Sequence, residues 1–382
     1  GIGVSILGQY KQNFAGQWGA AKLADGSFDV GNVLIVIAAL GLGRLITLPF
    51  AGPISDRFGR KTSALIGVLC YAVYFVGIVF SPNMYVAYAF AIMGGAANSF
   101  LDTGVIPACL EILVESSGLA TIFTKLAVSL GQLLLPTMIG FVAANELSFK
   151  SIFFLMAALI IIDGILIAFM PVPPMNSNVK SGENAASQKM KFTPAAIALI
   201  AIGFTCTSTF QLWLNCNQEF GKLVGMADPS RIQSYYSTGT IIAVLLTAFL
   251  MKKKVQPLKF LVLYPAIAMT MLIIVYIVKT PFICLLGGFV IGFSAAGGVL
   301  QMATAAANDM FPANKGKITS IIMIASSLAN YIILNIAGIL TKNGGAEGPL
   351  HVILLNIGIT FIGILLAVFV NSQYRKGKVK AS

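Results

Sequence analysis

Three ionisable side chains lie inside long apolar stretches of the sequence, where a charge is costly. Arg44 falls within the stretch 31–50, Asp102 within 84–113 and Lys125 within 118–143. On membrane-insertion scales such a residue costs about 2.5–3.5 kcal/mol at the centre of a spanning helix, so its presence indicates a function or a partner. A carboxyl group beside a basic group is suited to binding and releasing a proton. The chemistry to expect is proton transfer or ion pairing.

Helical geometry predicts that two of these side chains lie at similar depths. At a rise of 1.5 Å per residue, Arg44 is about 12 Å from Gly52, where its stretch ends, and Asp102 is about 16 Å from the end of its own. Asn98 precedes Asp102 by one helical turn on the same face. We therefore predict a buried cluster of Arg44, Asp102 and Lys125, in which Asp102 carries a coupling proton and the basic groups control its protonation. A permanent structural ion pair is the alternative.

Amide side chains recur at helical spacing on two further segments. Gln9, Gln12 and Asn13 share one face near the N-terminus, with Lys11 close by, and a second set is formed by Gln211, Asn215 and Gln218. Amides both donate and accept hydrogen bonds, so they suit hydroxyl and carboxylate groups of a ligand. Hydrogen bonding between helices is the competing interpretation.

The composition decides which elements hold these residues. Of 382 residues, 57% are hydrophobic and 10% are charged, and the mean hydropathy is +0.89. A soluble domain has about 25% charged residues, so this chain has too few to cover a water-exposed surface. We expect a multi-pass protein of the cell membrane. The net charge of +12 comes from basic residues spread over short loops, so we expect no nucleic-acid partner.

Motifs for metal or covalent chemistry are missing from the sequence. The five cysteines have no metal-binding spacing, and His351 is the single histidine. There is no nucleophile elbow, zinc-protease helix or phosphate-binding loop. We expect no cofactor and no metal, and we do not expect an enzyme.

Eleven apolar runs are long enough to cross a bilayer as helices, at about 20 residues each. They are 31–50, 64–82, 84–113, 118–143, 148–171, 194–220, 232–251, 258–278, 281–310, 318–341 and 349–371. The segment 1–18 reads as the back part of a twelfth, and we expect the native chain to begin upstream of it. A stretch rich in Ser, Asn, Gly and Pro follows the run 148–171, which is the sixth span when segment 1–18 is counted as the first. We predict an N-terminal six-helix bundle over 1–171, a cytoplasmic linker over 172–193, and a C-terminal six-helix bundle with a basic tail over 194–382.

Basic residues predict the orientation. If both termini and the linker face the cytoplasm, sixteen Lys and Arg residues lie in inside loops and six in outside loops. Positive residues favour the cytoplasmic side, so we predict cytoplasmic termini. We expect a monomer in the lipid bilayer.

One loop carries a motif. The run from Gly52 to Lys61 reads Gly-Pro-Ile-Ser-Asp-Arg-Phe-Gly-Arg-Lys. It resembles the signature of the major facilitator superfamily between helices 2 and 3, G-x-x-x-D-[RK]-x-G-[RK]-[RK], and every defining position is filled. The matching residues are Gly52, Asp56, Arg57, Gly59, Arg60 and Lys61. The resemblance implies a twelve-helix fold of two six-helix bundles and a loop that latches the halves together.

The resemblance also implies a function. In that family helices 1, 4, 7 and 10 line a central cavity, so the residues expected to face a substrate are Gln9, Lys11, Gln12, Asn13, Asn98, Gln211, Asn215 and Gln301. We expect a secondary active transporter that moves a small polar solute together with protons by alternating access. Lys11 and Arg44 favour a carboxylate-bearing anion, followed by a sugar or polyol. The alternatives are a proton-coupled drug exporter and a transporter-like solute receptor.

Overall fold

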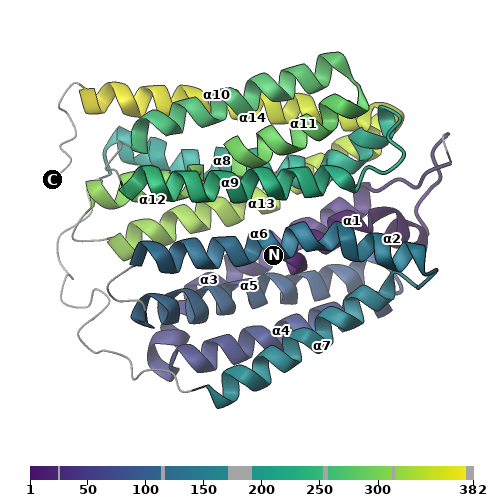
Figure 1. Cartoon of the computed structure of the whole chain (residues 1–382), viewed down its shortest axis with the longest axis horizontal. Coiled ribbons are helices and arrows are strands. Elements are labelled where there is room, and N and C mark those ends of the chain that lie inside the picture. The colour runs from purple at the N-terminus through teal and green to yellow at the C-terminus, as the bar shows by residue number, and fades with distance from the viewer. Residues whose placement is uncertain (25, 113–116, 171–191, 253–256, 312–314, 376–382) are drawn as a thin grey trace. The chain divides into compact units, whose positions relative to one another are not determined.

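The computed structural model describes residues 1–382 except 25, 113–116, 171–191, 253–256, 312–314 and 376–382. Nearly all of the described residues are helical (Figure 1). In chain order the helices are α1 (Ile2–Gln9), α2 (Lys11–Gln17), α3 (Gly31–Phe58), α4 (Arg60–Phe80), α5 (Met84–Ile112), α6 (Ser117–Ala144), α7 (Lys150–Phe169), α8 (Pro194–Leu223), α9 (Arg231–Lys252), α10 (Pro257–Val278), α11 (Pro281–Ile291), η3 (Gly292–Ala296), α12 (Val299–Met310), α13 (Lys315–Gly344), η5 (Gly345–Glu347) and α14 (Gly348–Arg375).

These elements confirm the expected twelve-helix fold. The first span is broken at Tyr10 into α1 and α2. The tenth consists of α11, the π-helical turn η3 and α12, and Gly298 follows η3 with a φ of 140°. Nine helical stretches of the described chain are long and apolar enough to cross a membrane, and one of them, residues 318–375, contains both α13 and α14.

Local sequence accounts for where several helices begin. Thr193 caps α8, because its hydroxyl oxygen accepts a hydrogen bond from the backbone N–H of Ala196 at 3.2 Å. Thr280 caps α11 in the same way, with Ile283 as donor. A proline follows each cap at the first helical position, where a missing N–H costs nothing.

The backbone contacts divide the chain into two compact units. Unit 1 contains residues 1–175 and 330–351, and unit 2 contains residues 176–329 and 352–382. In unit 1, α3 and α4 both pack along α5, and α7 packs along α4. Phe14 of α2 meets the rings of Phe149 and Phe153 edge-on, at 5.3 and 5.4 Å between ring centroids. The predicted division at residues 171 and 194 stays a prediction.

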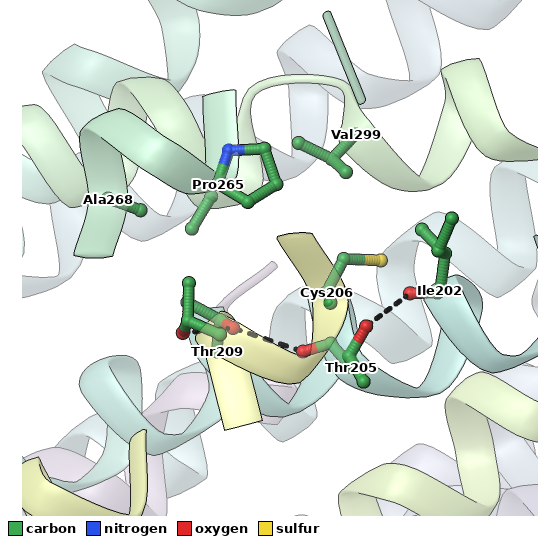
Figure 2. A pocket seen from close by; sticks show the side chains of 10 residues that line it. Ile202, Thr205, Cys206, Thr209, Pro265, Ala268 and Val299 are labelled. Atoms are coloured by element: carbon green, nitrogen blue, oxygen red, sulfur yellow. Dashed lines mark hydrogen bonds between the residues drawn. The ribbon is translucent and has the colours of Figure 1, made fainter. Parts of the chain in front are cut away.

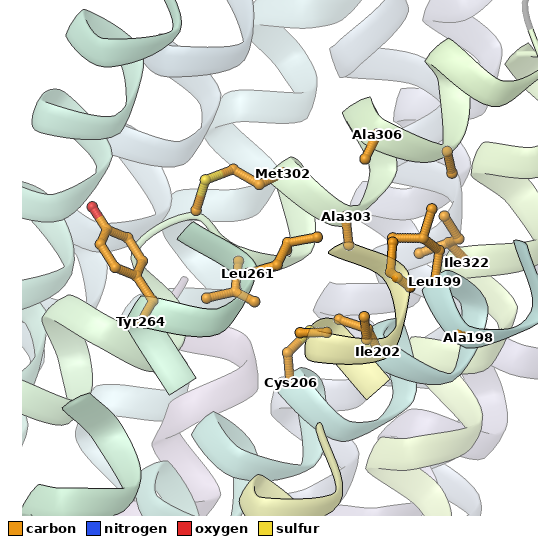
Figure 3. Close-up of a cluster of buried hydrophobic side chains, with 14 of the residues drawn as sticks. Ala198, Leu199, Ile202, Cys206, Leu261, Tyr264, Met302, Ala303, Ala306 and Ile322 are labelled. Atoms are coloured by element: carbon orange, nitrogen blue, oxygen red, sulfur yellow. The ribbon is translucent and has the colours of Figure 1, made fainter. Parts of the chain in front are cut away.

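Unit 2 has an apolar core built from side chains of five helices (Figure 3). Leu199 and Ile202 of α8 pack with Leu261 of α10, with Met302 and Ala303 of α12, and with side chains of α13 and α14. Small residues such as alanine let the helices approach closely, as is usual in membrane bundles. The outward faces of both units carry large apolar side chains, including Phe80, Leu166, Phe169 and Phe282. This pattern fits a protein surrounded by lipid.

Candidate functional site

Two glycines bring α3 and α5 together at the level of the predicted charge cluster. A Cβ atom on Gly43 would lie 2.0 Å from the carbonyl oxygen of Ile92, and one on Gly95 would lie 2.1 Å from that of Leu40. No larger residue fits either position, because the two backbones are in direct contact. This contact places Arg44 beside the turn of α5 that carries Asp102.

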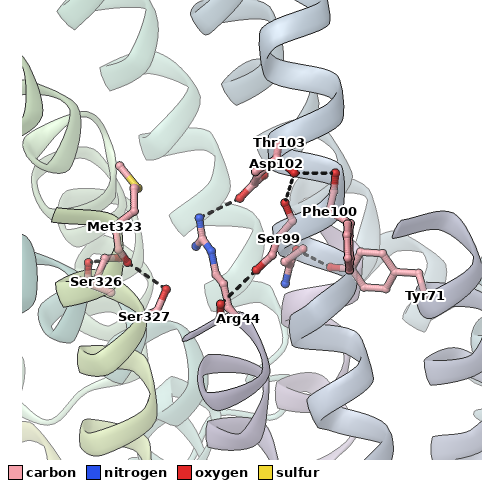
Figure 4. Close-up of polar contacts among 11 residues, drawn as sticks. Arg44, Tyr71, Ser99, Phe100, Asp102, Thr103, Met323, Ser326 and Ser327 are labelled. Atoms are coloured by element: carbon pink, nitrogen blue, oxygen red, sulfur yellow. Dashed lines mark hydrogen bonds and ion pairs between the residues drawn. The ribbon is translucent and has the colours of Figure 1, made fainter. Parts of the chain in front are cut away.

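Arg44 and Asp102 form an ion pair (Figure 4). The Nη2 atom of Arg44 donates to Oδ2 of Asp102 at 2.8 Å. The side chains are 29% and 41% exposed, so the pair is within reach of solvent. The Nε atom of Arg44, which lies on the same edge of the guanidinium as Nη2, is buried and makes no hydrogen bond within the described residues. Nε and Nη2 form a two-donor fork, and Nε is the donor of this fork that is unused.

Hydrogen bonds fix the turn of α5 around this pair. The hydroxyl of Tyr71 in α4 donates to Oδ1 of Asn98 at 2.5 Å. The hydroxyl of Ser99 donates to the backbone carbonyl of Arg44 at 3.1 Å. Asn98 and Asp102 thus lie one turn apart, with Asn98 held from α4 and Asp102 held from α3.

The residues of the sequence motif close the connection between α3 and α4. Gly59 has a φ of 96°, in the region that favours glycine, and the chain reverses there between the two helices. Arg60 then reaches back one turn, and its Nη1 atom pairs with Oδ1 of Asp56 at 2.5 Å. Arg57 stacks over the ring of Phe58, and Lys61 donates to the carbonyl of Met170 at 3.4 Å. Asp56 and Arg60 therefore form an internal pair at the loop.

The candidate residues of the first span have different environments. Lys11 is fully buried and Gln9 is nearly so, whereas Asn13 is exposed. The amide of Gln12 is occupied by the backbone of Phe28, since its nitrogen donates to the Phe28 carbonyl at 3.0 Å and its oxygen accepts from the Phe28 N–H at 2.8 Å. Gln12 thus ties the segment after α2 to the helix.

In unit 2 the candidate amides of α8 bond to each other. The side-chain nitrogen of Asn215 donates to both the backbone and the side-chain oxygen of Gln211, each at 3.0 Å. Gln301 lies in α12 and is half-buried. The structure therefore brings Gln211 and Asn215 together on one face of α8.

A small cavity in unit 2 is lined mainly by α8, with two residues each from α10 and α14 (Figure 2). Its volume is about 10 Å³, which is the space of one water molecule. The hydroxyl of Thr205 donates to the carbonyl of Ile202, and that of Thr209 to the carbonyl of Thr205. Its polar groups are occupied, so this cavity is no candidate for a solute site.

Comparison with known proteins agrees with the motif and the fold. The sequence profile of the Major Facilitator Superfamily matches residues 4–333. The chain belongs to this superfamily. It is 34% identical over 358 residues to the MFS-type transporter YfkL of Bacillus subtilis, covering 91% of this chain and 89% of the relative. It is 33% identical over 386 residues to the inner membrane transport protein YdiN of Escherichia coli, covering 98% of this chain and 87% of the relative.

Solved structures of the superfamily share the fold at low sequence identity. The crystal structure of a D-xylose–proton symporter gives a TM-score of 0.70 at 18% identity, covering 97% of this chain and 95% of that one. The inward-open xylose transporter XylE of Escherichia coli gives 0.69 at 15% identity, covering 98% and 96%. The expectations of a superfamily fold, a multi-pass membrane protein and a transporter rather than an enzyme are confirmed.

Some polar residues of this superfamily member escaped the sequence prediction. Asn217 in α8 is 1% exposed, and neither atom of its amide makes a hydrogen bond within the described residues. Trp213, one turn earlier, has a buried indole N–H in the same condition. Asp163 lies among exposed apolar residues of α7. The cost of a charge inside an apolar run, which singled out Asp102, could also have pointed to Asp163. The sequence gives no signal for Asn217, because only its unmet hydrogen bonds distinguish it from the neighbouring amides. The side chain of Lys125 lies outside the described residues.

Proposed function

We propose that this transporter couples the uptake of a small, carboxylate-bearing organic solute to protons, with Asp102 as the proton carrier and Arg44 as the group that binds the carboxylate. The observation behind the proposal is the half-used guanidinium fork of Arg44. A carboxylate takes both donors of such a fork in parallel hydrogen bonds. Asp102 takes one of them.

Protonation of Asp102 would free Nη2, the donor of Arg44 that Asp102 holds. A neutral carboxyl group is a weaker partner for Arg44, so a proton on Asp102 releases Nη2 and Nε together to a carboxylate from outside. Loss of the proton restores the internal pair and expels the solute. Proton and solute are thus bound together, which is the requirement for symport. Lys125, predicted in the same cluster, adds positive charge that favours an anion.

The second half contributes neutral hydrogen bonds. Asn217 and Trp213 lie one turn apart on α8 with unmet donors and, for Asn217, an unmet acceptor. Leaving such groups buried costs about 1–3 kcal/mol each, and a hydroxyl or carboxylate oxygen of the solute would satisfy them. We place Gln9, Lys11, Asn13, Asn98, Gln211, Asn215 and Gln301 in the binding set, and leave out Gln12, whose amide Phe28 occupies. Asn217 and Trp213 form a separate candidate pair, because they lie on the opposite face of α8 from Gln211 and Asn215. A sugar or polyol is the next candidate for the solute.

The test is transport by the purified protein in liposomes with an imposed proton gradient. The solute is first found by a thermal-shift screen of carboxylates, sugars and lipophilic cations, in which a ligand at about 100 times its Kd stabilises by about 2.7 kcal/mol. Asp102→Asn should abolish accumulation and leave solute exchange intact, because the site remains but the proton is no longer carried. Asp163→Asn, which alters the exposed carboxylate of α7, is the matched control and should accumulate solute normally. Unimpaired accumulation in Asp102→Asn would exclude Asp102 as the carrier.

Proton-coupled drug export is the second candidate. One relative is the multidrug resistance protein 2 of Bacillus subtilis, at 24% identity over 232 residues and 58% of this chain. Under export, lipophilic cations would stabilise the protein in the screen and carboxylates would not. The positive charges of Arg44 and Lys11 argue for the anion.

A further inference from the structure

The backbone carbonyl of Thr103 in α5 takes a hydrogen bond from another helix because its own helix has no donor for it. In an α-helix this oxygen accepts from the residue four positions later, which here is Pro107. Proline has no N–H, so the carbonyl is left free and the helix can bend at this point. The hydroxyl of Ser55, buried in the last turn of α3, donates to the free carbonyl at 2.7 Å.

The same hydroxyl accepts a hydrogen bond from the motif loop. The Nη1 atom of Arg60 lies 3.0 Å from Oγ of Ser55 and also pairs with Asp56. A hydroxyl has one proton, and Ser55 gives it to Thr103, so it can meet Arg60 only as an acceptor. The hydrogen bonds therefore run in one direction, from Arg60 through Ser55 to the free carbonyl of α5.

The free carbonyl belongs to the residue next to Asp102. Asp102 is held on its other side by Arg44, so any change in that ion pair acts on the turn of α5 just before Pro107. A helix that lacks one intrahelical hydrogen bond yields more easily there than elsewhere. Ser55 is the one described side chain that bonds both to this carbonyl and to the motif loop.

We infer that Ser55 is a positioning residue that transmits the protonation state of Asp102 to the Asp56–Arg60 pair of the motif loop. The inference rests on the proposed role of Asp102. It gives the motif loop a physical connection to the proton site, through one hydroxyl and one proline. Loss of that hydroxyl would leave the ion pair at Asp102 intact and disconnect it from the loop.

The experiment compares amide hydrogen exchange of residues 55–62 in four forms of the full chain at one pH. Asp102→Asn serves as a fixed mimic of the protonated carboxyl group, so no pH correction is needed. The four forms are the unsubstituted protein, Asp102→Asn, Ser55→Ala and the double variant. We expect Asp102→Asn to change the exchange rate of this segment several-fold relative to the unsubstituted protein. The double variant should exchange like Ser55→Ala alone.

Ser63→Ala is the matched control. Ser63 is equally buried and also donates to a carbonyl of α5, that of Phe100 at 2.8 Å, but it has no hydrogen bond to Arg60 among the described contacts. Ser63→Ala removes a comparable interhelical hydrogen bond. The change in hydrogen exchange of residues 55–62 on Asp102→Asn should nevertheless persist in this variant. Ser55→Thr keeps the hydroxyl and should restore the response. Pro107→Ala gives Thr103 an intrahelical donor and should weaken it.

The failure of this inference differs from the failure of the proposed function. If Asp102→Asn changes the segment equally with and without Ser55, or not at all, Ser55 transmits nothing. If Asp102→Asn still accumulates solute, Asp102 is not the proton carrier, whatever the exchange shows. In transport, Ser55→Ala should reduce accumulation several-fold and flatten its pH profile while exchange of solute continues, and an unaltered pH profile would overturn the inference.

Discussion

The two compact units differ in one described feature of their interiors. In unit 1 two charged pairs, Arg44 with Asp102 and Asp56 with Arg60, join helices alongside neutral hydrogen bonds such as that of Tyr71 with Asn98. In unit 2 neutral hydroxyl groups join helices, such as Thr207 with Ser326 and Thr209 with Thr360.

A carboxylate changes its bonds when it takes up a proton, whereas a hydroxyl pair does not. From the pair of Arg44 and Asp102 we predict that the response to protons lies in unit 1 and that unit 2 makes neutral contacts with the solute.

Exchanging the charges of unit 1 should have the largest effect. Arg44→Asp places two carboxylates side by side, and we expect loss of both transport and folding stability, because the two like charges repel each other and the ion pair between α3 and α5 is gone. The double variant Arg44→Asp with Asp102→Arg restores an ion pair of reversed direction. It should recover thermal stability but not solute accumulation, as measured by thermal unfolding and by flux in liposomes. Full recovery of accumulation would mean that the pair acts only as a structural tie.

The backbone contact between α3 and α5 should be nearly as sensitive. Gly95→Leu drives a side chain into the carbonyl of Leu40, and separating the helices would remove Arg44 from Asp102. We expect a loss of several kcal/mol and no transport, in line with overpacked cores, which lose about 1–3 kcal/mol or more. Gly140→Leu is the control, because a Cβ there meets nothing within 4 Å. A stable Gly95→Leu protein with normal flux would show that this contact does not position the pair.

Much of this arrangement could be predicted from the sequence, and the reasons are local. Apolar runs give spanning helices, and charge cost alone singled out Arg44 and Asp102, which the structure pairs at 2.8 Å. Depth along a helix follows from counting residues, so the pairing of Arg44 with Asp102 could be predicted. The motif from Gly52 to Lys61 gave the family.

The rest depends on which partner each polar group finds. Gln12, taken as a ligand contact, bonds instead to the backbone of Phe28, sixteen residues away. Asn217 is one of several amides in α8, and its unmet hydrogen bonds exist only in the packed structure. Pro107 predicts from the sequence that the carbonyl of Thr103 lacks its helical donor. The hydroxyl that bonds to this carbonyl comes from Ser55, 48 residues before Thr103. Sequence spacing predicts faces of helices and not these long-range pairs.

A buried amide that awaits a solute should cost stability in the empty protein. Asn217→Leu removes unmet donors and an unmet acceptor, so we expect thermal stability to rise by about 1–3 kcal/mol while KM increases tenfold or more. Asn356→Leu is the comparison in the same unit. Its amide nitrogen donates to the carbonyl of Thr209 at 3.1 Å, so this change should lower stability and leave KM alone. If Asn217→Leu instead lowers stability, Asn217 has a structural partner and is no solute contact.

The smallest effect is expected from the neutral contacts that join α8 to α14. The hydroxyls of Thr209 and Thr360 lie 2.8 Å apart, and the Thr360 hydroxyl also lies 2.7 Å from the carbonyl of Asn356 one turn earlier. Thr360→Val keeps the shape and removes one hydroxyl. Interhelical hydrogen bonds in membrane proteins average about 0.6 kcal/mol, so thermal stability should fall by that order, with accumulation and its pH profile unchanged. A shift in the pH profile would instead place part of the proton response in unit 2, and the separation of charged and neutral roles between the two units would then fail.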